Sequence, residues 1–426
     1  MPLTEQSQLK ANGSVRKKQQ AVTSFEYHDA LLRHLVDDES VIDARVVFLT
    51  HYIPLYQVRV LQAIAARVRD FQILLSTPIE PNRDFQPDWS GLNVTVQNSW
   101  TLRRRWRHPD GGFDDQLYVH VPYDTSARLR ELKPDVVMSL ELGARSAGAA
   151  LYCRRHPETK LVLCTYMSER TEQGRGFVRR KLRQRLLRSA DAVTYNGPSC
   201  KDYLNGFGVQ SDRMFHLPYA ADDRTVYQGP TERDEADCRH RMLVVGQLSQ
   251  RKGVDRLVRQ VASYCRANPD RKIEIVFAGD GPLRDELKTI ETTANLKVNL
   301  LGNVPAEELA VWMLRCGVLL APTLADEWML VVNEALHAGV PVIGSIHAQA
   351  VTTLVKEDVN GWTYDPMEDG SIDQALDTYF DQSDQDLSDM RVVCRQSVAS
   401  RSPAWAADGA IRAIKHVLPL DQDGSQ

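Results

Sequence analysis

The chain has 426 residues, enough for two domains that each bury a hydrophobic core. Hydrophobic residues make up 43% of it and charged residues 25%, with a formal net charge of −4, which is the composition of an ordinary globular protein. No apolar run approaches the roughly 18 residues that a membrane-spanning helix requires, so no such helix is predicted.

The N-terminal segment and the cysteines both indicate a cytoplasmic protein. Residues 1–24 are polar and rich in Gln and Lys, without the apolar stretch of a signal peptide, and we expect a disordered tail there. The seven cysteines are an odd number, scattered and without CxxC spacing. This pattern argues for reduced thiols and against a zinc site or a disulfide framework. We expect no bound metal.

From residue 25 onward, strand-like runs alternate with helical patterns, which is typical of doubly wound parallel sheets. In the first half we predict strands at 45–49, 71–76, 92–97, 135–140, 160–165 and 192–195. Helical patterns between them include 56–68, 144–155 and 177–187. We therefore assign residues 25–220 to an N-terminal Rossmann-like domain.

Basic residues concentrate in this first half. One cluster is the run 103–107, and the segment 151–190 holds eleven Lys and Arg against three Glu. Such patches bind anionic lipid surfaces or phosphorylated substrates. The same patterns also fit the solvated face of a helix at 176–189 and a charged loop at 103–107. Both interpretations stay open.

A polar, acidic stretch at 221–240, with Gly229 and Pro230, is the predicted interdomain linker. The alternation then restarts, with predicted strands at 241–245, 272–278, 297–301, 317–321 and 340–344. We assign residues 241–402 to a second Rossmann-like domain, followed by a final helix at 403–418 and a tail at 419–426. The predicted fold class is therefore α/β, with two facing doubly wound domains.

The predicted strand at 317–321 leads into the most informative loop of the chain. Pro322 ends the strand, Asp326 and Glu327 follow, and a helical pattern runs over 330–338. In such a unit the loop lies at the carboxyl edge of the sheet, where open α/β sheets bind ligands. The free N–H groups at the start of the helix favour an anion such as a diphosphate.

Two acids in this unit are candidate ligand-binding residues. Asp326 precedes the helix and Glu334 lies one turn into it, so both can face the same ligand. Two carboxylates beside an anion repel it, so we expect them to accept hydrogen bonds from hydroxyl groups. A nucleotide sugar supplies a diphosphate for the helix and hydroxyls for the acids. The alternative is an ordinary strand–helix unit with surface acids.

Two earlier loops of the second half support a diphosphate ligand. After the strand at 241–245, Gly246 permits close backbone approach, and Lys252 is a mobile point charge suited to a diphosphate. Gly279 and Gly281 form a tight turn after the next strand, although such a turn is more often only a connection between strand and helix.

These elements, together with Leu301-Gly302-Asn303-Val304-Pro305, resemble the donor half of the family 4 retaining glycosyltransferases, the group 1 enzymes with the GT-B fold. The donor motif of that family has two glutamates separated by seven residues around a Phe/Trp-Gly-Leu-Val core. Asp326 falls on the first acid position and Glu334 on the second, with Trp328 on the core. The resemblance implies two facing Rossmann-like domains with a cleft between them and a final helix that packs back across both.

The resemblance also implies roles for single residues. Asp326 would contact the donor sugar near its reacting carbon, Glu334 would hold the ribose hydroxyls, and Lys252 would neutralise the leaving diphosphate. The implied donor-binding positions are Gly246, Gln247, Arg251, Lys252, Gly279, Gly281, Met329, Leu330, Val331 and Glu334. The chain departs from the family at Asp326, usually Glu, at Met329, usually Gly, and at Gln247, usually Arg. Where relatives often place a His after the fourth strand, it has Leu140, followed by Glu141.

We therefore expect a cytoplasmic, metal-independent, retaining glycosyltransferase without a cofactor. It would move a hexosyl group from a nucleotide sugar to the hydroxyl of a saccharide or lipid-linked acceptor, in surface polysaccharide or glycolipid biosynthesis. A candidate further partner is the anionic inner membrane face, which the protein would contact peripherally. We expect no nucleic-acid partner. The alternatives are a nucleotide-sugar epimerase of the same fold and a non-catalytic binding protein. His51 and Glu169 are further candidates for the cleft and the acceptor.

Overall fold

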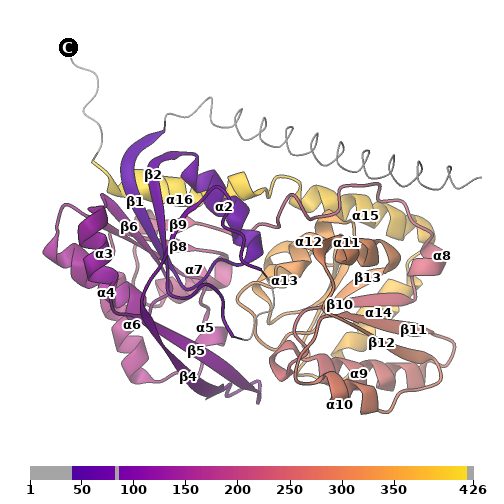
Figure 1. Cartoon of the computed structure of the whole chain (residues 1–426). Helices are drawn as coiled ribbons and strands as arrows, with labels where there is room; N and C mark the ends of the chain where they lie inside the picture. Colours follow the sequence, from indigo (N-terminus) through magenta and orange to yellow (C-terminus); the bar gives the residue numbers. More distant parts are fainter. Residues whose placement is uncertain (1–40, 82–85, 420–426) are drawn as a thin grey trace, which may run out of the picture.

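The computed structural model describes residues 41–81 and 86–419. Two α/β domains lie side by side, each built on a parallel sheet with helices on both faces (Figure 1). The predicted fold class is therefore confirmed. The predicted tail at 1–24, and all of the predicted tail at 419–426 except Pro419, lie outside the described residues.

The N-terminal sheet has seven parallel strands in the order β3-β2-β1-β6-β7-β8-β9. Its strands are β1 (Ile42–Thr50), β2 (Val68–Leu75), β3 (Asn93–Val96), β6 (Val136–Leu140), β7 (Lys160–Cys164), β8 (Ala192–Tyr195) and β9 (Met214–His216). Its helices are α2 (Leu55–Ala65), α3 (Thr125–Leu132), α4 (Ala144–Arg155), α5 (Glu169–Glu172), α6 (Phe177–Ser189) and α7 (Pro198–Asn205). Neighbouring residues Val46 and Val47 of β1 are both fully buried, as expected for a strand covered on both faces.

An antiparallel hairpin interrupts this domain. Strands β4 (Ser99–Arg107) and β5 (Asp114–Pro122) pair along their whole length, from Ser99 opposite Pro122 to Arg107 opposite Asp114. The arginine run 103–107 is therefore part of a strand, and the interpretation as a charged loop is wrong. The consecutive arginines hide the period-two alternation, and a two-stranded ribbon leaves enough surface in water to accept them. The short strand β9 was missed as well.

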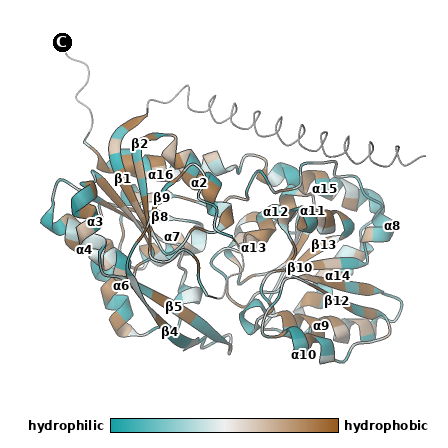
Figure 2. Ribbon diagram, in the orientation of Figure 1, coloured by the Kyte–Doolittle hydropathy of each residue, from teal (hydrophilic) through white to brown (hydrophobic). Residues whose placement is uncertain are grey.

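The C-terminal sheet has six parallel strands in the order β12-β11-β10-β13-β14-β15. Its strands are β10 (Arg241–Val245), β11 (Ile273–Ala278), β12 (Leu296–Gly302), β13 (Val318–Ala321), β14 (Val342–Ser345) and β15 (Gly361–Tyr364), of which only β15 was not predicted. Its helices are α9 (Val254–Ala267), α10 (Arg284–Thr289), α11 (Ala306–Arg315), α12 (Val331–His337), α13 (Gln349–Leu354), α14 (Ser371–Asp381) and α15 (Asp384–Val398). Figure 2 shows hydrophobic strands at the centre of both domains, with polar residues on the outer helices.

Part of the segment predicted as the linker belongs to the C-terminal domain. Helix α8 (Glu235–Cys238) lies within 221–240, and Glu235 is buried. Arg391 of α15, which has no exposed surface, donates from Nε and Nη2 to the two Glu235 oxygens at 2.6 and 2.7 Å. The same guanidinium reaches the backbone carbonyls of Gly317 and Gly339 at 3.3 and 3.2 Å. This clamp fixes α8 and α15 to the ends of the strand β13 and the helix α12.

The last helix, α16 (Pro403–Val417), returns to the N-terminal domain and packs against α2, β7, β8 and β9 (Figure 1). Its buried side chains include Ala410 and Ile414, which share a core with Val46 and Phe48 of β1. Gly409 lets the helix approach β9 closely, because a Cβ there would collide with the backbone of His216. The chain therefore crosses between the domains twice.

Candidate active site

The loops after β10 and β13 meet at one edge of the C-terminal sheet because these strands are parallel neighbours. The backbone carbonyl of Arg251 accepts hydrogen bonds from Leu324 N at 2.9 Å and Thr323 Oγ1 at 3.2 Å. Gly253, with φ of 67°, lies so close to the second loop that a Cβ would collide with the Pro322 carbonyl. The two predicted donor-binding loops are thus held together by their own backbones.

This contact brings together two residues predicted to act in catalysis. Lys252 Nζ donates a hydrogen bond to Asp326 Oδ2, and a guanidinium nitrogen of Arg251 lies 3.6 Å from the same oxygen. Burial alone would raise the pKa of Asp326, but the two cations outweigh it and hold that pKa at about 2. Asp326 is therefore ionised at neutral pH and paired with the Lys252 ammonium.

A cavity of about 450 Å³ opens in front of this pair, between the two domains. Its lining includes Arg251, Lys252, Asp326, Glu327, Met329 and Leu330 from the C-terminal domain, and Trp106, Asp115, Thr171 and Arg175 from the N-terminal domain. Arg251 Nε pairs with Asp115 of β5 at 3.3 Å, so the hairpin forms one wall of the cavity. The other predicted donor residues, Gly246, Gln247, Gly279, Gly281, Val331 and Glu334, do not line this cavity.

Glu334 occupies a different environment from Asp326. It is half-buried in the first turn of α12, and burial raises its pKa to about 7, with a further contribution from the charge of Asp222. Asp222 belongs to the segment that leaves the N-terminal domain. The two acids therefore do not share one cavity, and Glu334 sits beside the interdomain crossing.

The two glycines of the predicted nucleotide turn have a role in backbone packing. A Cβ on Gly279 would collide with the carbonyl oxygen of Gly246, and one on Gly281 would collide with that of Leu248. Leu248 N also donates to the Asp280 carbonyl at 3.0 Å. Only glycine at these positions lets the loops after β10 and β11 lie in contact.

Met329 stands at the motif position that is usually glycine, and the structure shows why glycine suits it. Its φ is 78°, a left-handed conformation that is costly for a residue with a Cβ. The side chain is buried in the C-terminal core. Apolar burial therefore offsets backbone strain at this position.

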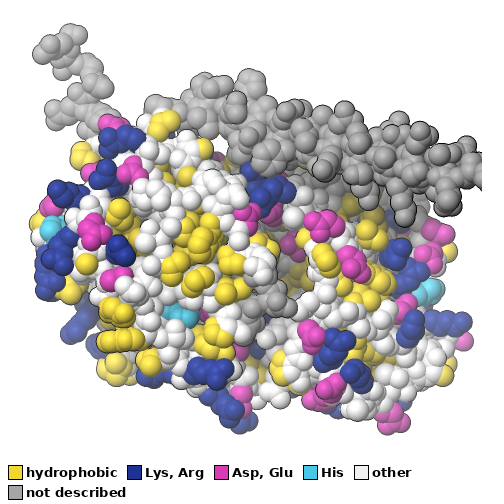
Figure 3. Space-filling view, viewed as in Figure 1, with side chains coloured by type: hydrophobic (Ala, Val, Ile, Leu, Met, Phe, Trp, Pro, Cys, Tyr) yellow, Lys and Arg dark blue, Asp and Glu magenta, His cyan; other side chains and the backbone are white. Residues whose placement is uncertain are grey.

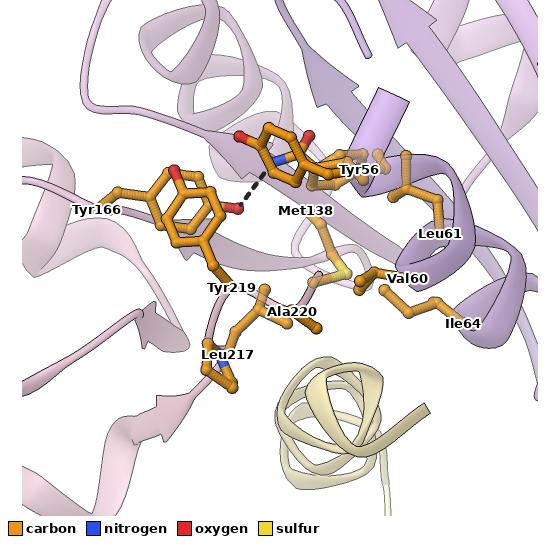
Figure 4. Close-up of a pocket in the computed structure, with 12 residues that line it drawn as sticks. Tyr56, Val60, Leu61, Ile64, Met138, Tyr166, Leu217, Tyr219 and Ala220 are labelled. Carbon is orange, nitrogen blue, oxygen red and sulfur yellow. Dashed lines mark hydrogen bonds between the residues drawn. The ribbon is translucent and has the colours of Figure 1, made fainter. Parts of the chain in front are cut away.

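Trp328 anchors the same loop. Its Nε1 donates to Asn333 Oδ1 at 2.8 Å, and its ring stacks on Tyr219 with centroids 5.8 Å apart. Behind Tyr219 lies a nearly filled apolar pocket of about 30 Å³, the space of one water molecule (Figure 4). At its rim Gln57 Nε2 donates to the Tyr166 hydroxyl at 3.4 Å. The N-terminal domain thus packs, through Tyr219, against the loop that carries Trp328.

A second cavity, of about 420 Å³, continues from the first toward the N-terminal domain. Gln247 lines it, as do His51, Leu140, Glu141, Arg145, Glu172, Arg175, Arg179 and Glu327. The Glu172 carboxylate faces three arginines at once. It accepts a hydrogen bond from Arg183 and lies 3.8 Å from Arg175 and 3.5 Å from Arg179. Arg183 is buried and does not line the cavity, so the positive charge that a ligand meets beside Glu172 is that of Arg175 and Arg179.

His51, a candidate for the cleft, lines the second cavity. Burial lowers its pKa, against the raising effect of Glu141. Burial would raise the pKa of Glu141, but the charges of His51 and Arg145 lower it on balance. Glu169 lies elsewhere, in a pocket with His347 and Gln349. It therefore does not share the cavities around Asp326.

Glu327, next to Asp326, is one position out of register with the donor motif and yet lies in the site. It lines both cavities, and its backbone carbonyl accepts a hydrogen bond from Asn196 Nδ2 of the N-terminal domain at 2.8 Å. Burial raises its pKa to about 7, and the neighbouring carboxylates of Glu141 and Asp326 raise it further than Arg175 lowers it. Glu327 enters the site through contacts between the two domains, which no sequence motif marks.

Among the described residues, no three His, Cys, Asp or Glu side chains are grouped so as to hold a metal ion. Over the same part of the chain, no helix is both long and apolar enough to cross a membrane.

Two family models match the chain. The one described as "Glycosyl transferases group 1" matches residues 232–396, and the one described as "Glycosyl transferase 4-like domain" matches residues 54–220. The first match covers the donor motif and the second covers most of the N-terminal sheet.

Several curated proteins are similar over part of their length. An uncharacterized glycosyltransferase of Methanocaldococcus jannaschii is 30% identical over 139 residues, 32% of this chain and 34% of that protein. The D-inositol 3-phosphate glycosyltransferase of Corynebacterium diphtheriae is 28% identical over 182 residues, 39% of this chain and 43% of that protein. The chain thus spans less than half the length of these relatives.

Solved structures share the fold over nearly the whole described chain. The HepE protein of Anabaena in complex with UDP has a TM-score of 0.66 at 14% identity, over 88% of this chain and 100% of that one. The lipopolysaccharide outer core galactosyltransferase WaaB has a TM-score of 0.62 at 13% identity, over 88% of this chain and 100% of that one. At such identities the likeness concerns the arrangement of the two domains.

Proposed function

The chain belongs to the group 1 glycosyltransferases of the GT-B fold, and from this premise we propose that it is a retaining hexosyltransferase that uses a nucleotide sugar. The observation that carries the proposal is the Lys252–Asp326 pair at the wall of the interdomain cavity. Solved neighbours in complex with UDP and with UDP-glucose support a nucleotide-sugar donor.

The proposed donor site uses both members of the pair. The diphosphate takes Lys252 as its counterion and so frees Asp326 to accept a hydrogen bond from a hydroxyl of the hexose. Lys252 and the N–H groups at the start of α12 then stabilise the negative charge that develops on the leaving diphosphate, usually the largest contribution to catalysis of this kind. Glu334 holds the ribose hydroxyls.

In the proposed transfer step, the bond between the sugar C1 and the diphosphate oxygen breaks and a bond from C1 to the acceptor oxygen forms on the same face. The proton of the acceptor hydroxyl passes to the departing phosphate oxygen. This course follows from the family. The chain's own contribution is to hold both substrates between the domains, where water is excluded.

We place the acceptor in the second cavity, against the N-terminal domain. The arginines around Glu172 favour an acceptor that carries a phosphate. One relative bears the name D-inositol 3-phosphate glycosyltransferase, and another, from Schizosaccharomyces pombe and 30% identical over 106 residues, is a phosphatidylinositol N-acetylglucosaminyltransferase subunit. Both names support a phosphate-bearing acceptor. The place of action is the cytoplasm, at or near the inner membrane face, in polysaccharide or glycolipid biosynthesis.

The test begins with a panel of nucleotide sugars, each screened for thermal stabilisation of the protein, because a bound ligand raises apparent stability. With the donor found, Lys252→Ala should lower turnover about 10²–10³-fold, the effect of removing one preorganised charge at the leaving group. Lys288→Ala, an exposed lysine that pairs with Asp285 on α10, serves as the matched control. Glu334→Ala should weaken donor binding.

Normal turnover by Lys252→Ala, or normal donor binding by Glu334→Ala, would refute the donor-site assignment. Nucleotide binding measured by calorimetry without any turnover would indicate the non-catalytic alternative, which Gln247 and Met329 favour. Release of a new hexosamine from UDP-N-acetylglucosamine without an acceptor would indicate an epimerase.

A further inference from the structure

The large aromatic side chains that are exposed lie on the hairpin, directly after it or on α6, and the rings of Trp100 and Tyr123 have centroids 5.2 Å apart. Among residues 41–81 and 86–419 there are three of them, Trp100 (65% exposed), Tyr123 (58%) and Phe177 (71%). They belong to β4, to the residue after β5 and to the first turn of α6. The exposed aliphatic residues Leu102, Val178 and Leu182 lie on the same elements. Exposed apolar residues scattered singly need no explanation, but this clustering does.

The hairpin and α6 border the same cavity. Leu117 and Val119 of β5 line the second cavity together with Leu182 of α6. The Arg175 guanidinium, just before α6, lies 4.1 Å from the ring centroid of Trp106 on β4. We call β4, β5, Tyr123 and α6 the hairpin–α6 surface.

This surface is strongly basic. Strand β4 carries four arginines, of which Arg104 shares a face with Trp100 and Leu102 and the other three lie on the opposite face. Helix α6 carries six Lys or Arg, of which Arg183 is buried against Glu172, and neither element has an acidic residue. Strand β5 adds Asp114 and Asp115, but Asp115 is paired with Arg251 across the cleft. In Figure 3, dark blue basic and yellow hydrophobic side chains lie together at the lower left, where Figure 1 shows β4, β5 and α6.

We propose that the hairpin–α6 surface docks the N-terminal domain onto an anionic lipid bilayer. Exposed aromatic and aliphatic side chains enter the headgroup region, while the arginines and lysines of β4 and α6 contact lipid phosphates. Tryptophan and tyrosine suit this boundary because one part of each ring is apolar and another part forms hydrogen bonds. A nucleic acid would use the basic residues and the rings, but it would gain nothing from Val178, Leu102 and Leu182.

Docking in this way turns the second cavity toward the membrane, because the hairpin and α6 form its rim. An acceptor with an apolar tail in the bilayer and a phosphate-linked head group could then reach the arginines around Glu172. This consequence rests on the proposed transferase function. The docking itself does not.

The experiment is sedimentation of the full chain with vesicles of phosphatidylcholine alone and of phosphatidylcholine mixed with phosphatidylserine. We expect binding to the mixed vesicles at low salt, little to the neutral ones, and loss at high salt because screening weakens the contacts. Trp100→Ser combined with Phe177→Ser should weaken binding at least tenfold. Val359→Ser combined with Val392→Ser, two exposed apolar residues of the C-terminal domain, is the matched control and should bind normally.

Thermal unfolding of both variants establishes that they are folded. The proposal fails if the wild-type chain does not sediment with mixed vesicles at low salt, or if the control variant loses binding equally. It also fails if the surface instead mediates self-association seen by light scattering without vesicles, or binds single-stranded oligonucleotide more tightly than lipid. Normal donor turnover in solution by Trp100→Ser combined with Phe177→Ser separates loss of docking from loss of the proposed activity.

Discussion

Charged side chains are paired differently within the C-terminal domain and at the cleft. Two carboxylates of the C-terminal domain each have their own cation from that domain, Asp326 with Lys252 and Glu235 with Arg391. At the cleft the balance is uneven, since three arginines of the N-terminal domain surround Glu172, while the Glu327 carboxyl of the C-terminal domain faces the carboxylate of Glu141 as well as Arg175. Charges paired within one domain hold the fold together, whereas uneven charges between domains are suited to a ligand. Substitutions of these carboxyls test this contrast.

The largest effect is expected where a pair is broken inside the C-terminal domain. Glu235→Ala leaves the fully buried Arg391 without a counterion, and we expect the free energy of unfolding to fall by about 3–5 kcal/mol. Urea denaturation measures it. Replacing both Glu235 and Arg391 by Met should recover much of the loss because no charge then remains buried. A double variant as unstable as the single one would contradict this account.

An intermediate effect is expected from the carboxyls without a cation of their own. Glu327 and Glu334 have pKa values of about 7 in the folded protein, against 4.5 ordinarily. The folded state therefore binds more protons than the unfolded state between these values, and the free energy of unfolding falls as pH rises through this window, then levels off above pH 7. Each group contributes roughly 1–3 kcal/mol.

Glu327→Gln and Glu334→Gln should each flatten this pH dependence, as measured by denaturant unfolding between pH 5 and pH 8. The exposed Glu291→Gln provides the control and should leave the profile unchanged. Asp326 gives the opposite sign, because cations lower its pKa to about 2, so its stabilisation is lost only in strong acid. A profile identical in all three Gln variants would mean that these carboxyls do not differ between the folded and unfolded states.

The smallest effect concerns the backbone of the donor loop. At Met329, with its positive φ, Met329→Gly should be more stable than Met329→Ala by about 1 kcal/mol, since both lose the buried side chain but only Ala keeps the strain. Thermal unfolding of the two variants compares them directly. The reverse order would show that the loop relaxes to a negative φ once the methionine is gone.

The sequence predicts the donor half of the C-terminal domain better than it predicts the N-terminal wall of the cleft. The donor half can be predicted because its parts are close in sequence. The strand 317–321, the loop acid Asp326 and the helix around Glu334 all lie within one strand–helix unit. The predicted strands of both sheets and the family resemblance are confirmed. The assigned roles of Lys252, Asp326 and Glu334 stay predictions.

The N-terminal wall of the cleft could not be predicted from the sequence, for physical reasons. It combines Glu141, Arg145 and Arg175 with Glu327, and no local sequence pattern expresses contacts between residues so far apart along the chain. The hairpin was missed because consecutive arginines look like a loop when the partner strand is not known. The donor motif does not mark Glu327, because the motif concerns residues that face the donor, whereas Glu327 faces the N-terminal domain.

The return of α16 to the N-terminal domain has a consequence for synthesis on the ribosome. Ala410, Ile414 and Val417 complete the core that Val46 and Phe48 begin. A ribosome makes the chain from its N-terminus, so the first sheet stays without this covering until nearly all 426 residues are made. The C-terminal domain, whose core lies between residues 219 and 398, has its whole sequence earlier. The domain that begins first is therefore the one that finishes last.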